Sequence, residues 1–119
     1  MDLNMPMADA LGRYLDLASQ QMKVTAQNAA NIDTPGYKTV GFDFGSEFQT
    51  ALQRSGNVAP AAADVREVDG LVSRPDGNNV SMDREAMNLA KAQLEFRTGV
   101  ELLKHEYSRM MSALRSDGK

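Results

Sequence analysis

The sequence has 119 residues and contains no cysteine and no tryptophan, and only 6% of its residues are aromatic. The absence of cysteine excludes disulfides and thiolate metal sites. Lysine and arginine number 13 against 16 acidic residues, which gives a net charge of -3, and no basic run is present. Nucleic acid is therefore not expected as a partner, because binding to phosphates needs a concentrated positive surface.

Long apolar runs are missing as well. No segment approaches the roughly 18 consecutive apolar residues that suggest a transmembrane helix, so we expect a chain that is not inserted in a membrane. The opening segment Met1–Ala8 lacks the basic and apolar regions of a secretory signal peptide. We therefore expect no cleaved leader.

The sequence also lacks the residue sets that support catalysis. His105 stands alone between Lys104 and Glu106, and a single histidine without cysteine does not form a typical zinc site. No serine–histidine–aspartate set, phosphate-binding glycine loop or pair of catalytic carboxylates is present. We expect no enzymatic activity, no cofactor and no metal site.

The N-terminal third has the heptad pattern of a coiled coil. Apolar residues recur in steps of four and three, which is the 3.5-residue period of a coiled-coil seam. The pattern predicts a helix within residues 1–33, with Asn4 as its N-cap and Pro6 in its first turn. The predicted seam comprises Leu11, Leu15, Ala18, Met22, Thr25, Ala29 and Ile32.

The helix is expected to end abruptly. Thr34 precedes a proline, which disfavours the helical region for its backbone. Pro35 and Gly36 suit the central positions of a type II turn. Asn31 or Asp33 could provide a left-handed helix cap before this turn.

The C-terminal segment, residues 81–119, carries a longer heptad pattern. Ser81 is a suitable N-cap, and Asp83 and Glu85 favour the positive end of the helix dipole. Gln93 is the one polar member of the seam, where it either sets the register or faces a solvated gap. The predicted seam comprises Met82, Ala86, Leu89, Gln93, Phe96, Val100, Leu103, Tyr107, Met110 and Leu114.

Residues 34–80 between the two helices form a loop-rich insert. Phe44, Phe48 and Leu52 would share one face of a short helix near residues 45–54. Val65–Val68 and Leu71–Val72 flank Asp69–Gly70, which suggests a marginal hairpin. Asp76–Asn79 would form a further turn. The expected fold is all-α: one elongated unit in which the two long helices pack as an antiparallel coiled coil.

These features resemble a known family. The stretch from Ala26 to Lys38, with Asn28, Asn31 and the turn Thr34–Lys38, resembles the asparagine-rich signature of bacterial flagellar rod and hook subunits. Residues 76–85, Asp-Gly-Asn-Asn-Val-Ser-Met-Asp-Arg-Glu, resemble the start of the C-terminal helix in basal-body rod proteins of the proximal-rod type. The short length of the chain and Phe42-Asp43-Phe44 fit the same type.

The resemblance implies a structural subunit that assembles by coiled-coil packing into the proximal part of the periplasmic rod. It implies export through the flagellar type III apparatus without a cleaved signal peptide. The implied partners are further copies of the chain, other rod subunits, the rod-base adaptor and membrane-ring proteins, and the export apparatus during secretion. A different class stays open: a helical adaptor outside the flagellum that binds one partner helix in its heptad groove.

The individual motifs allow simple and specific interpretations. The heptads could form an ordinary hairpin within one chain, or a seam completed by neighbouring subunits. Asn28 and Asn31 could be surface caps, or could bind across subunits beside the turn. Phe44 and Phe48 could be the buried face of a short helix, or an apolar motif that engages the export gate. The expected interface comprises Leu11, Leu15, Ala18, Met22, Asn28, Ala29, Asn31, Ile32, Pro35, Gly36, Tyr37, Leu89, Phe96, Val100, Leu103, Tyr107, Met110 and Leu114.

Overall fold

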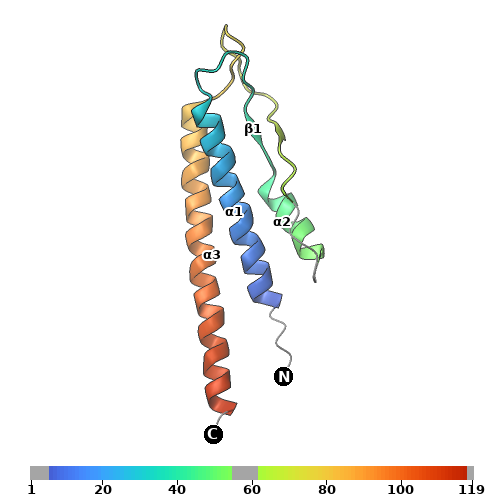
Figure 1. The fold of residues 1–119 in the computed structure, drawn as a ribbon, viewed down its shortest axis with the longest axis vertical. Coiled ribbons are helices and arrows are strands. Elements are labelled where there is room, and N and C mark those ends of the chain that lie inside the picture. The colour runs from blue at the N-terminus through green and yellow to red at the C-terminus, as the bar shows by residue number, and fades with distance from the viewer. Residues whose placement is uncertain (1–5, 55–61, 118–119) are drawn as a thin grey trace.

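A computed structural model describes residues 6–54 and 62–117 of the chain. Helix α1 (Pro6–Ala30) lies antiparallel to helix α3 (Met82–Asp117), and the insert runs back along one side of this pair (Figure 1). The molecule measures 71 × 25 × 18 Å. The expected fold class, all-α and elongated, is confirmed.

The boundaries of α1 follow from local chemistry. Pro6 occupies the first helical position, where its missing N–H is no loss. After Ala30 the helix tightens, because the N–H groups of Asn31 and Ile32 donate to carbonyls three residues earlier. The left-handed cap expected at Asn31 or Asp33 is wrong, since in the described part of the chain only glycines have positive φ. The proposed N-cap Asn4 lies outside the described residues.

The turn after α1 has the expected geometry. The Tyr37 N–H donates to the Thr34 carbonyl over 3.2 Å, and Gly36 has a φ of 76°. A left-handed residue at the third position defines a type II turn, and glycine adopts this conformation without strain. The type II turn predicted at Pro35–Gly36 is therefore confirmed, whereas α1 already ends at Ala30, before Thr34.

Helix α3 begins as the sequence predicts. The Ser81 hydroxyl accepts a hydrogen bond from the Arg84 N–H over 3.3 Å, which is the N-cap contact, and Asp83 and Glu85 lie in the first turn. At its other end α3 extends past the start of α1 (Figure 1).

Small residues bring the two helices together. Ala92 is fully buried, and a Cβ atom on Gly99 would lie 2.8 Å from Leu15 Cδ2 and 3.0 Å from Tyr14 Cδ1. The side of α3 that meets α1 therefore follows Glu85, Ala92 and Gly99. This line is offset from the expected seam through Leu89 and Phe96, because small side chains allow the helix backbones to approach most closely.

The described part of the insert contains three short elements: strand β1 (Val40–Gly41), helix α2 (Phe44–Gln53) and strand β2 (Arg66–Glu67). Asp43 caps α2 by accepting the Ser46 N–H. The two strands pair antiparallel, with Val40 opposite Glu67. The expected hairpin across Asp69–Gly70 is therefore wrong: β2 pairs with β1, and Leu71–Val72 are not in a strand.

Candidate functional site

Asn28 connects α1 to the insert. Its side chain is 1% exposed and donates to the Val40 carbonyl over 2.8 Å, while its oxygen accepts from the Val40 N–H and the Tyr37 hydroxyl. The amide thus acts like a neighbouring strand for β1. The side chain is buried and bonds to Val40 and Tyr37 within its own chain, so a contact of Asn28 across subunits stays a prediction.

Asn31 also acts locally. Its amide donates to the Gln27 carbonyl and accepts the Thr34 hydroxyl, so it closes the last turn before Pro35. Burial raises the pKa of the Tyr37 phenol, and a hydrogen bond with Gln27 partly opposes this. Pro35 and Gly36 are exposed at the tip of the molecule.

Two further asparagines, Asn78 and Asn79, also connect the insert to the long helices. The four residues Asn28, Asn31, Asn78 and Asn79 are called the asparagine junction below. For Asn78 and Asn79 the sequence suggested only a turn. Asn78 is fully buried and donates to the carbonyls of Asn31 and Thr34. Asn79 accepts the Thr39 N–H over 2.7 Å. Asn78 thus joins the turn after α1 to the segment before α3, and Asn79 joins the same segment to Thr39 of the insert. The signal in the sequence was the concentration of asparagines on both sides of the insert.

Charged side chains reinforce this junction. Arg74 donates to the Val80 carbonyl and to the Ile32 carbonyl, and the Lys38 ammonium donates to the Gly77 carbonyl. Glu85 is 1% exposed and forms a 2.8 Å ion pair with Arg84. From the sequence, Glu85 was expected only to interact with the positive end of the helix dipole of α3. Its burial beneath the junction follows from the position of α3 against α1.

The predicted motif residues Phe44 and Phe48 anchor α2 to α1. Both rings meet Tyr14 edge-on, with centroid separations of 5.2 and 5.4 Å. Burial, with a smaller contribution from Glu95, raises the pKa of Tyr14. Both rings are half-buried, so the two interpretations of the motif, the buried face of a short helix and an export-gate motif, stay predictions.

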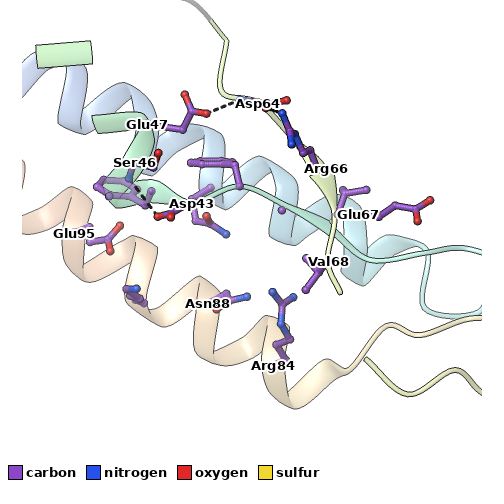
Figure 2. A pocket seen from close by; sticks show the side chains of 17 residues that line it. Asp43, Ser46, Glu47, Asp64, Arg66, Glu67, Val68, Arg84, Asn88 and Glu95 are labelled. Atoms are coloured by element: carbon purple, nitrogen blue, oxygen red, sulfur yellow. Dashed lines mark hydrogen bonds and ion pairs between the residues drawn. The ribbon is translucent and has the colours of Figure 1, made fainter. Parts of the chain in front are cut away.

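A groove of about 680 Å³ separates the insert from α3 (Figure 2). Arg84, Asn88, Lys91 and Glu95 line its α3 side, while Asp43, Glu47, Asp64 and Glu67 lie on the insert side. Within the described residues no group of three histidine, aspartate or glutamate side chains is arranged to hold a metal ion.

The opposite side of α3 is apolar and is not covered by the insert. Leu89, Phe96, Tyr107 and Leu114 are 38%, 37%, 48% and 40% exposed. These four residues, with Met82 and the half-buried Val100, are called the apolar stripe below. Leu11 and Ala18 of the expected interface are instead buried within the chain, whereas Leu15, Met22, Ala29, Ile32, Leu103 and Met110 are half-buried.

The fold and this surface define a class: an elongated helical hairpin that leaves a long apolar helix face open. The comparisons with known proteins agree. Residues 15–38 match the family model described as flagella basal body rod protein. No helix among the described residues combines the length and apolar character that crossing a membrane requires.

Similarity to individual proteins extends over most of the chain. It is 35% identical to the flagellar basal body rod protein FlgB of Salmonella typhimurium, over 84% of this chain and 86% of the relative. It is 31% identical to FlgB of Escherichia coli, over 86% and 88%, and 31% identical to FlgB of Bacillus subtilis, over 87% and 89%. The chain belongs to the FlgB family of flagellar basal body rod proteins.

Proposed function

We propose that the chain is a structural subunit of the flagellar basal body, assembling into the proximal part of the rod by packing its helices against those of neighbouring rod subunits. The observation that carries this proposal is the apolar stripe on α3. Its residues follow one side of the helix from Met82 to Leu114 and are 37% to 48% exposed apart from the half-buried Val100. An exposed apolar surface of this kind marks an interaction site.

The wider proposal follows from the family. The chain acts as one structural unit of three segments, 1–33, 34–80 and 81–119, and α1 (Pro6–Ala30) and α3 (Met82–Asp117) lie in the first and the last of them. Its partners are further copies, other rod subunits, and the rod-base adaptor and membrane-ring proteins. It reaches the periplasm through the type III export apparatus without cleavage. The role in the rod is mechanical and not enzymatic. Membership of a family of rod proteins supports this proposal.

The proposal is tested by replacing two stripe residues, Phe96→Ser with Tyr107→Ser. The matched control is Val72→Ser, since Val72 is 88% exposed on the insert. The chain is produced in bacteria that lack their own copy, and rod assembly is scored by purification of basal bodies and by swimming. We expect the stripe variant to be helical but absent from basal bodies, and the control to assemble. Normal assembly of the stripe variant would overturn the proposal.

Contact of Phe44 and Phe48 with the export gate stays a separate proposal. Both rings already contact Tyr14, so the motif can be presented only when α2 leaves α1. Phe44→Ala should block secretion while leaving assembly of the purified subunit intact. Unchanged secretion would leave these rings with the packing role alone.

A further inference from the structure

The outer edges of the helix pair carry complementary charges at matching heights. The edge of α1 is defined here by Asp9, Asp16 and Lys23, which are seven residues apart and exposed. Asp9 and Asp16 precede the buried Leu11 and Ala18 by two residues, which is about 200° around a helix. These side chains therefore lie on the side of α1 that points away from α3.

The edge of α3 has the same geometry. It is defined by Ala90, Arg97 and Lys104, which are also seven residues apart and exposed. Ala90 and Arg97 precede the buried Ala92 and Gly99 by two residues, so this line points away from α1. The edge of α1 thus presents two acids, and the edge of α3 presents two bases.

We propose that the edge of α1 in one copy packs against the edge of α3 in the next copy, so that Asp16 meets Arg97 and Asp9 meets Lys104. The inference rests on the proposed rod function and names the partner surface. Because the two edges differ, the contact is heterologous and continues from copy to copy. Copies in such a row share one orientation, so α1 of one copy is antiparallel to α3 of the next.

The register supports these pairs. Gly99 lies against Leu15 within the chain, so position 16 is level with about position 98 and position 9 with about position 105. If neighbouring copies lie at the same height along the helix axis, each aspartate is therefore within about one residue position of the basic residue that it is proposed to meet. The third positions, Lys23 and Ala90, meet without a charge conflict. Met87 and Leu94 flank Ala90 and are 73% and 64% exposed, so the contact also covers apolar surface.

The edge charges are available for such a contact. None of the ion pairs among the described residues involves Asp9, Asp16 or Arg97. Lys104 is 3.6 Å from Glu101, and both side chains are about two-thirds exposed (70% and 67%). Glu101 reduces the positive charge of the α3 edge without cancelling it, because Arg97 and Lys104 lie on either side of it.

Cysteine cross-linking tests the contact directly, since the natural chain has no cysteine. The variant K23C/A90C places one thiol on each edge. Within one molecule the two thiols point in opposite directions from a helix pair, beyond the reach of a disulfide. The matched control is K23C/K91C, in which the second thiol moves about 100° around α3 to the groove side. Each single-cysteine variant is a further control.

In purified basal bodies treated with a mild oxidant, K23C/A90C should give a ladder of linked chains, and the controls should give little linkage. Basal bodies that assemble while K23C/A90C links no better than K23C/K91C would overturn the edge contact and leave the rod function standing. Strong dimers in either single variant would indicate like edges meeting, and would also overturn it. Wild-type chains that never enter basal bodies would overturn both proposals.

Charge exchange provides an independent measure. D16R or R97D alone should weaken association of the full chain by on the order of tenfold, and D16R/R97D should recover most of the loss. E67R changes the same charge on the exposed insert and should have no effect. Additive losses in D16R/R97D would contradict the pairing.

Discussion

At the residue scale, the clearest constraint is the contact at Gly99. Glycine in a helix interior usually costs stability because it is flexible. Here its missing side chain allows α3 to lie against Tyr14 and Leu15. Gly12, on α1, is different, because a Cβ atom there would meet nothing within 4 Å. Gly12 and Gly99, which lie in the two long helices, therefore give a matched comparison.

Replacing Gly99 with valine should lower the free energy of unfolding by about 1–3 kcal/mol, because the added methyl groups overpack the helix contact. Gly12→Val has the same helix propensity change without the clash. Urea denaturation followed by circular dichroism measures both. Equal losses would show that propensity, and not packing, determines the effect at Gly99.

Glu95 should make stability depend on pH. Burial raises its pKa, with Lys91 partly opposing. The folded chain therefore holds this proton more tightly than the unfolded chain, so stability falls as pH rises above the ordinary glutamate range. Glu95→Gln should be more stable than the wild type near pH 7 and equal to it below about pH 4. Urea denaturation at each pH measures the difference, with the exposed Glu67→Gln as control.

At the element scale, α2 depends on few contacts. Its only packing partner among the described elements is α1, and the aromatic contacts to Tyr14 are supported by a hydrogen bond from Arg13 to the Arg54 carbonyl. The asparagine junction instead fixes the other end of the insert near the tip. Helix α2 should therefore be able to open without disturbing α1 and α3.

Phe48→Ala should increase amide exchange throughout α2 while leaving α1 and α3 protected, because an edge-on ring pair and its buried surface are lost. Gln49→Ala changes an exposed neighbour on the same helix and should have little effect. Mass spectrometry of deuterium uptake distinguishes the two. Uniform loss of protection in all three helices would show that α2 is part of the same cooperative unit.

At the scale of the whole molecule, the long helix has more apolar surface than the chain covers. The apolar stripe lies on the side away from the insert, and the last turns of α3 extend beyond α1 (Figure 1). Met111 and Leu114 in those turns are 49% and 40% exposed. In the proposed rod, neighbouring subunits would cover these surfaces.

Amide exchange should therefore change on assembly. In the dilute chain, residues 109–116 should exchange quickly, because no described segment of α1 packs beside them. In isolated basal bodies the same residues should be protected, while the Gly99 region should be protected in both states. Equal protection of residues 109–116 at every dilution would contradict the proposed role of neighbouring copies.

Much of this architecture is determined by sequence. The 3.5-residue period predicts both long helices, and the residue chemistry of Pro35, Gly36 and Ser81 predicts where one ends and the other begins. These signals are local, since φ preference and capping depend on adjacent residues. Phe44 and Phe48 likewise predict α2, because their spacing places both rings on one face.

Tertiary structure alone determines which side of α3 meets α1 and what the asparagines bind. Apolar periodicity predicts only the centre of the apolar side of a helix. In α3 this side is wider than the contact with α1, and the part beside that contact is exposed. The contact itself lies where Ala92 and Gly99 permit close approach. Asn28 and Asn78 bind partners 12 and 47 residues away, and no local pattern encodes such a partner. Local sequence thus sets the elements, whereas packing and long-range hydrogen bonds set their register.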